Sequence, residues 1–371
     1  MKAKKIYFRI ILITIPLIFT FLLLIALEFF LRHRAEMSGI FYAFNNERMI
    51  MLEEQNPNSN FFTGVKDENG KLTISGTDEQ GFLLPKSRHE DPDIVLAFLG
   101  GSTTYLAEVQ PEDRFHYLVG VSLEELLDIK VNSLNAGVSG GDTSQTINTL
   151  YNKVLAQKPD YVLIMHAVND LNRLLVFDTY FNTKSLRRSV KLKYSFANSL
   201  RYFKNRYFSH TYVAIRPFLN YFMFWKDIND EWEKYIEDEI VFDETLILKQ
   251  FRSAQLTAVT MAKSWGATPI LLIQPNLFKN LSASDAPFQQ EFIDKIKNRW
   301  GLSFDQYQRI YKEFLQVVRD VAEDSNVQIV DLDQEIPPSP TYFADEVHIN
   351  TTGSKMAAEL ITNVIVKEIR K

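Results

Sequence analysis

Five short segments with the character of strands, separated by segments with helical periodicity, dominate the chain from residue 93 onward. They cover residues 94–99, 131–134, 161–165, 269–273 and 327–330, and those over 94–99 and 161–165 are continuous apolar runs. Continuous apolar runs of this length are typical of strands that are buried on both faces. The regular alternation of strand and helix therefore predicts an α/β fold, in which a five-stranded parallel sheet carries helices on both faces.

The segments between these runs contain recognisable helix ends. Pro111 suits the first turn of a helix that we expect to reach about residue 127. Asp142 or Thr143 can cap a helix that reaches about residue 156. Ser303 and Gln306 have the spacing of a capping box. Further helices are expected over residues 251–265, 304–321 and 353–369.

The N-terminal segment has a different pattern, a long apolar run over residues 10–27 that follows four basic residues. About 18–20 apolar residues suffice to cross a bilayer as a helix. The residues after the run are bulky or charged, whereas a cleaved signal peptide needs small residues there. We expect residues 1–35 to be an uncleaved, single-pass signal anchor. The excess of Lys and Arg before the run predicts a cytoplasmic N-terminus and a main domain that is periplasmic or extracellular.

Composition narrows the function classes. The net charge of -5 disfavours nucleic acid as a partner, and the absence of cysteine excludes disulfides, thiolate metal sites and a cysteine nucleophile. Asp331, Asp333 and Glu335 follow the last expected strand without a histidine partner, so we interpret them as loop-solvating or helix-capping residues and predict no metal and no cofactor. The sequence does not indicate an oligomeric state.

Polar and glycine residues collect where four of the expected strands end, the edge at which parallel sheets carry their chemistry. Ser102 follows the first strand, and a serine hydroxyl becomes a nucleophile only when a base removes its proton. His348 can be that base, and Asp345 can orient its imidazole. The N–H groups of Ser102 and Gly140 and the side-chain amide of Asn169 can stabilise an oxyanion.

The residues at these four strand ends resemble the four conserved sequence blocks of the SGNH (GDSL-like) hydrolases. Residues 100–102 match the first block, 135–140 the second, 167–170 the third and 345–348 the last, so the resemblance covers residues 93–371 apart from a middle insertion. It implies a three-layer α/β/α sandwich of the flavodoxin-like SGNH type. It also implies a catalytic set of Ser102, Asp345 and His348, with Ser102, Gly140 and Asn169 as the oxyanion hole.

The chain departs from the family pattern in three places. Gly101 stands where the founding members have Asp, although many relatives share the Gly-Gly-Ser form and this Asp is not a triad member. Ala167 stands where Gly is usual. Gly140 and Gly141 are adjacent, so counting from Asn135 favours Gly140 as the oxyanion donor, whereas counting back from residue 142 favours Gly141.

The resemblance and the anchor together predict a serine esterase or acyltransferase that forms an acyl-serine intermediate. The expected substrate is an acyl ester, most simply an O-acetyl group, of an envelope or exported glycan. Two alternatives remain open: a lipid esterase, and a non-catalytic glycan-binding scaffold of the same fold. The complete triad favours an enzyme over the scaffold.

Two further segments lie outside the resemblance. Residues 36–92 are expected to be a spacer that packs on the main domain. Residues 171–247 form the middle insertion, which has no acidic residue between Asp178 and Asp227 but many basic and aromatic ones, and then nine acidic residues from Asp227 to Glu244. This pattern predicts either a helical cap that meets a membrane surface or an acidic glycan, or two oppositely charged helices that pair with each other.

Overall fold

The computed structural model describes residues 2–38, 55, 57–58, 60–66, 72–85, 89–181, 207–208, 211, 242–279 and 287–371. The chain forms two compact units. One comprises Met1–Phe44 and Val190–Glu231, and the other comprises Asn45–Ser189 and Trp232–Lys371. The larger unit holds all of the predicted site residues.

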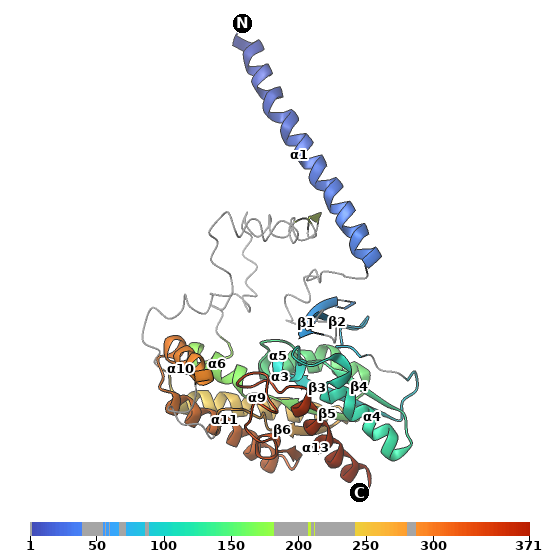
Figure 1. Cartoon of the computed structure of the whole chain (residues 1–371), viewed down its shortest axis with the longest axis vertical. Coiled ribbons are helices and arrows are strands. Elements are labelled where there is room, and N and C mark those ends of the chain that lie inside the picture. Colours follow the sequence, from blue (N-terminus) through green and yellow to red (C-terminus); the bar gives the residue numbers. More distant parts are fainter. Residues whose placement is uncertain are drawn as a thin grey trace. The chain divides into compact units, whose positions relative to one another are not determined.

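A five-stranded parallel sheet forms the centre of the larger unit, as the sequence predicts (Figure 1). Its strands are β3 (Ile94–Gly100), β4 (Val131–Asn135), β5 (Tyr161–Met165), β6 (Thr268–Leu272) and β7 (Gln328–Val330). Their order across the sheet is β4-β3-β5-β6-β7. The chain therefore moves outward in opposite directions from β3, and in such sheets ligands bind at the carboxyl ends of the strands beside this switch point.

Two apolar cores, one on each face of the sheet, make this unit a three-layer sandwich. In β3, Leu96 and Phe98 pack into one core, whereas Ala97 and Leu99 pack into the other. Successive side chains of a strand point to opposite faces, so a continuous apolar run can fill both cores. This packing explains why β3 and β5 are apolar along almost their whole length.

Helices cover both faces (Figure 1). One core is closed by α4 (Phe115–Leu127) and α13 (Thr351–Ile369). The other core is closed by α5 (Thr143–Thr149), α6 (Val168–Phe177), α9 (Glu244–Ser264), α10 (Pro287–Trp300) and α11 (Phe304–Asp324). The short helices α3 (Ser102–Tyr105) and α12 (Leu332–Glu335) follow β3 and β7.

Helix ends follow the sequence prediction in some places and differ in others. Asp142 caps α5 by accepting from the N–H groups of Ser144 and Gln145, and Ser303 and Gln306 form the predicted capping box of α11. The helix predicted over residues 111–127 is wrong in its first turn. There, a 3₁₀ turn is followed by Arg114 in an extended conformation, and α4 begins only at Phe115.

The helix predicted to reach residue 156 is likewise not one regular helix. Helix α5 ends at Thr149, and a single turn of π-helix over Leu150–Val154 and a 3₁₀ turn over Leu155–Gln157 complete it. Leu150 and Val154 are fully buried, and wide turns of this kind rotate side chains relative to a regular helix. Packing of these two residues therefore accompanies the change of helix type.

The segment before β3 contributes a hairpin and part of a core. Strands β1 (Asn60–Lys66) and β2 (Leu72–Gly76) pair antiparallel with a shift in register. Beyond them Phe82 and Leu83 are buried, and the Leu83 N–H donates to the Asn135 carbonyl at the end of β4 over 2.9 Å.

The insertion predicted over residues 171–247 lies largely outside the described residues, as does its predicted division into helices. Its two ends belong to the core. Helix α6 continues through Phe177 with Leu171 and Leu174 fully buried, and α9 begins at Glu244. Residues 171–177 and 244–247 of the predicted range therefore belong to helices whose apolar residues complete the sandwich.

The smaller unit contains α1 (Lys2–Ser38), which has the length and composition needed to cross a membrane over Thr14–Arg34. A signal sequence near an N-terminus would have the same properties. The apolar pattern of the sequence thus predicted this helix, and its length agrees with the expected anchor.

Candidate active site

The turn after β3 needs its two glycines because neighbouring loops approach it closely. A Cβ on Gly100 would lie 2.1 Å from Thr104 Oγ1 and 2.6 Å from the Met165 carbonyl oxygen. A Cβ on Gly101 would lie 2.3 Å from Asn169 Nδ2 and 2.8 Å from the Gly141 carbonyl oxygen. Glycine therefore allows the loops after β4 and β5 to reach the start of α3, where Ser102 is the first residue.

Ser102, His348 and Asp345 form one hydrogen-bonded chain. His348 Nε2 lies 2.8 Å from Ser102 Oγ, and His348 Nδ1 lies 2.6 Å from Asp345 Oδ2. The other carboxylate oxygen, Oδ1, accepts from the backbone N–H groups of Val347 and His348 over 2.9 and 2.8 Å. Residues 246 positions apart in the sequence thus meet at the carboxyl edge of the sheet.

The charges around His348 favour its protonated form. Burial alone lowers the pKa of His348, but the hydrogen bond and charge of Asp345 outweigh burial and raise the pKa above its usual value; Glu108 and Glu346 add to this effect. Burial has the opposite effect on Asp345 and by itself would raise the pKa of this carboxyl group. The hydrogen bonds and charge of His348 and the bond from the Val347 N–H outweigh burial and lower the pKa of Asp345. An imidazolium formed at His348 is therefore stabilised by a carboxylate that stays ionised.

The loops after β4 and β5 bring Asn169 and Gly141 close to Gly101, the residue before Ser102. Asn169 Nδ2 donates to the Gly141 carbonyl over 2.8 Å, which ties the two loops together. The Gly141 N–H donates to the Val138 carbonyl over 2.9 Å, whereas Gly140 is solvent-exposed with a φ of 73°. Since the Gly141 N–H is already engaged, we keep Gly140, which the count from Asn135 favours, as the candidate oxyanion donor.

A buried polar network lies beneath these two loops. Asp170 Oδ1 accepts from the Thr143 N–H over 2.9 Å and from the Tyr180 hydroxyl over 2.5 Å. His166 bonds Thr146 through Nε2 at 2.7 Å and lies 3.4 Å from Asp170 through Nδ1. Burial alone raises the pKa of Asp170, but the charge and hydrogen bond of His166, with further bonds, lower it. The network fixes the first turns of α5 and α6, next to Gly141 and Asn169.

Sequence reasoning missed several residues that position the site. Tyr180 lies at the start of the insertion and carries no motif. Gln274 accepts from the Val168 N–H over 3.1 Å, and the Asn135 amide donates to the Thr104 carbonyl over 2.8 Å. Arg114 is fully buried and donates to the carbonyls of Leu106 and Leu84. No sequence motif marks Arg114 as a positioning residue, and its extended backbone is visible only in the structure.

The acidic residues after β7 are engaged in ion pairs and hydrogen bonds. Asp331 accepts from Arg319 Nε at 2.9 Å, and Asp333 accepts from the Asn276 amide at 2.9 Å and lies 3.7 Å from Lys279. Across the described ranges, no cluster of His, Asp and Glu has the arrangement of a metal site.

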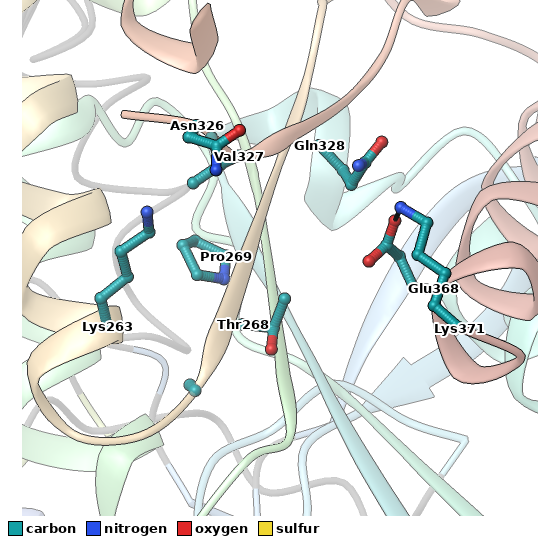
Figure 2. A pocket seen from close by; sticks show the side chains of 9 residues that line it. Lys263, Thr268, Pro269, Asn326, Val327, Gln328, Glu368 and Lys371 are labelled. Atoms are coloured by element: carbon teal, nitrogen blue, oxygen red, sulfur yellow. Dashed lines mark hydrogen bonds and ion pairs between the residues drawn. The ribbon is translucent and has the colours of Figure 1, made fainter. Parts of the chain in front are cut away.

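A hollow of about 350 Å³ opens at the amino ends of β6 and β7, where Figure 2 shows Lys263, Pro269 and Gln328 around it. Lys371 and Glu368 pair across its rim over 2.5 Å. Because the strands are parallel, this hollow lies at the edge opposite to that of Ser102. It has no part in the site described above.

The sequence profile of the GDSL-like lipase/acylhydrolase family matches residues 96–361. No curated protein matches the chain.

Solved structures similar to the chain include three hydrolases. A variant of an acetyl xylan esterase from Geobacillus stearothermophilus has 18% identity and a TM-score of 0.43, with 74% of this chain and 95% of that chain covered. A lipase/acylhydrolase from Enterococcus faecalis has 18% identity and a TM-score of 0.42, with 73% and 95% covered. An α/β hydrolase from the metagenome of Lake Arreo, Spain, has 16% identity and a TM-score of 0.43, with 73% and 94% covered.

The profile match covers most of the chain, including the loops that carry Ser102, Gly140 and Asn169 and the region of Asp345 and His348. The chain therefore belongs to the GDSL-like lipase/acylhydrolase family and is a serine hydrolase that acts on ester bonds.

Proposed function

We propose that this hydrolase removes or transfers an O-acetyl group of an envelope or exported glycan through an acyl-enzyme at Ser102. The observation that carries the proposal is the hydrogen-bonded chain from Ser102 through His348 to Asp345. A nucleophile, a base within hydrogen-bonding reach of it and a carboxylate that orients the base are the parts that acyl transfer requires.

In the first half-reaction, Ser102 Oγ attacks the ester carbonyl carbon while His348 Nε2 takes the hydroxyl proton. The tetrahedral intermediate then collapses. The bond to the alcohol oxygen breaks, and His348 returns the proton to that oxygen as the alcohol leaves. Asp345 stays ionised and stabilises the imidazolium in between. The low pKa of Asp345 and the raised pKa of His348 support this division of roles.

In the second half-reaction, His348 takes a proton from the incoming acceptor as the acceptor oxygen attacks the acyl carbon. The bond from that carbon to Ser102 Oγ then breaks, and His348 returns the proton to Ser102 Oγ. Water as acceptor completes a hydrolysis, and a glycan hydroxyl completes a transfer. The negative charge of both tetrahedral intermediates falls on the former carbonyl oxygen. The N–H groups of Ser102 and Gly140 and the Asn169 amide are proposed to bind it.

The exposure of the site supports a large substrate that carries a small acyl group. Ser102, Asn169 and His348 are half-buried, and Gly140 is exposed. A polymer can therefore present an ester to the triad from solvent, and an acetyl group needs little further space. Acetate release from an O-acetylated envelope polysaccharide should exceed fatty-acid release from phospholipid vesicles. The reverse order would favour the lipid esterase.

We further propose that α1 is an uncleaved anchor with a cytoplasmic N-terminus and that the hydrolase unit lies on the opposite side. The basic residues before the apolar run support this orientation. An alkaline phosphatase fused after Lys371 should be active. An inactive fusion together with an active cytoplasmic reporter at the same position would reverse the topology.

The test of the catalytic proposal is Ser102→Ala. Turnover of p-nitrophenyl acetate should fall by several orders of magnitude while the melting temperature stays within a few degrees. Equal rates of the two proteins would sink the proposal and promote the glycan-binding scaffold.

A further inference from the structure

One face of the membrane-spanning segment of α1 is covered by protein. Glu28 is 4% exposed, and the half-buried residues lie on the same side of the helix: Leu24, Ile25, Leu31 and Arg32. Positions 24, 25, 28, 31 and 32 form a single stripe at helical spacing. Residues on the other sides of the helix are solvent-exposed, for example Leu23 with 59% of its surface exposed and Phe29 with 69%. A helix that served only as a tether would not have such a covered stripe.

Two described residues of the insertion contact this face. The Thr211 N–H donates to Glu28 Oε2 over 2.8 Å, and Arg32 Nε donates to Glu28 Oε1 over 2.9 Å. Seven positions before Glu28, the Phe21 ring meets the Phe208 ring edge to face, with centroids 5.8 Å apart. Both oxygens of the carboxylate thus have a donor, and an apolar contact continues the same stripe.

The chemistry of Glu28 makes this arrangement informative. A carboxylate within an apolar span is costly unless it is paired and hydrogen-bonded. Arg32, one turn away, supplies the charge, but the second oxygen is satisfied from outside the helix. Hydrogen bonds from an N–H to an ionised acceptor are among the stronger ones in proteins. Glu28 is therefore suited to hold a second segment against α1.

The spacing of the contacts gives the direction of that segment. Phe21 and Glu28 are about 10 Å apart along the helix axis at 1.5 Å per residue. Their partners Phe208 and Thr211 are three positions apart in the chain. Thr211 therefore lies farther toward the C-terminal end of α1 than Phe208 does.

We propose that the insertion docks on α1 through Phe208 and Thr211 and enters the apolar layer of the membrane with it. The bilayer setting rests on the proposed anchoring, whereas the docking itself does not. The composition of the insertion fits such a place, because aromatic and basic residues without acidic ones suit an anionic membrane surface: Tyr194, Lys204, Tyr207, Arg216, Phe222 and Trp225.

Docking would make α1 a permanent part of the enzyme. Loss of the helix by cleavage would remove the acceptor of the Thr211 N–H. The insertion also joins α6 to α9 in the hydrolase unit, so the chain would be tied to the membrane at a second point besides the N-terminal helix.

Cysteine cross-linking in the full-length protein tests the docking, since the chain has no cysteine of its own. Phe21→Cys and Phe208→Cys are combined, a protease site is inserted after Asn46, and membranes are treated with a short bismaleimide. After proteolysis, cross-linked fragments stay together on a denaturing gel. The matched control combines Leu23→Cys with Phe208→Cys, because Leu23 points to the opposite face.

We expect the Phe21 pair to link several-fold more than the Leu23 pair within one chain. Adding Glu28→Leu should lower this yield several-fold, whereas Glu28→Gln, which keeps one acceptor oxygen, should retain most of it. Equal yields of the two pairs, or links only between chains, would overturn the docking while leaving the anchoring intact. A mature protein that lacks residues 1–35 would overturn both.

Discussion

Gly101→Ala should damage the proposed oxyanion site without touching the triad. The added Cβ would lie 2.3 Å from Asn169 Nδ2, about 1 Å short of ordinary contact, so the amide must move. Misplacement by 1 Å costs about 10²-fold in rate, and removal of an oxyanion donor costs about 10²–10³ in kcat. We therefore expect kcat to fall about 10²-fold with little change in KM.

The assay is p-nitrophenyl acetate turnover, arranged as a double-mutant cycle with Asn169→Ala. Once the Asn169 side chain is gone, the closest clash is relieved, and only the contact with the Gly141 carbonyl at 2.8 Å remains. The double variant should be within about twofold to threefold of Asn169→Ala alone. Gly120→Ala in α4 is the matched control and should keep full activity, since its Cβ would meet only Ser133 at 3.0 Å.

Two results would refute this reasoning. If Gly101→Ala keeps its full rate, the close approach of Asn169 has no role in turnover. If the rate losses of the two single variants multiply in the double variant, Gly101→Ala acts on a group other than Asn169. Melting temperatures of all four proteins separate either result from simple unfolding.

Three further predictions concern the same site. Asn169→Ala should lower kcat by about 10²–10³ at unchanged KM, because its amide acts on the oxyanion; a pure rise in KM would contradict that role. The acid limb of the kcat/KM profile should lie above the usual histidine pKa, since His348 must be neutral to act as base and its pKa is raised. In Asp345→Asn the residual activity should show this limb at lower pH, and an unmoved limb would exclude His348 as its source. Tyr180→Phe removes the hydroxyl bond to Asp170 and should lower kcat about tenfold at constant KM, whereas the exposed Tyr151→Phe should not.

Much of the sheet was predictable because strands such as β3 and β5 are buried on both faces and carry uninterrupted apolar runs. Residues 161–165 were predicted with both of their boundaries, and the Ser303–Gln306 capping box is a local signal that the structure confirms. The proposed site residues could be singled out because polar and glycine residues interrupt the apolar pattern where strands end.

Features that depend on distant contacts could not be predicted. Arg114 has an extended backbone, and its guanidinium donates to the Ser75 hydroxyl and to the carbonyl oxygens of Leu84 and Leu106. The most distant of these acceptors, Ser75, lies 39 positions away in the sequence. Leu106 is buried in a left-handed conformation with a φ of 52°, which a leucine does not signal. The bond from Tyr180 to Asp170 and that from Thr211 to Glu28 likewise join segments with no shared motif.

The most direct test of the central claim is covalent labelling of the full-length protein with a fluorophosphonate, which phosphonylates only a serine that a base has activated. The account predicts one label per chain, located on Ser102 by peptide mass spectrometry, and loss of labelling in His348→Ala at an unchanged melting temperature. A folded protein that stays unlabelled, or a label on another serine, would contradict the assignment of Ser102 as the nucleophile.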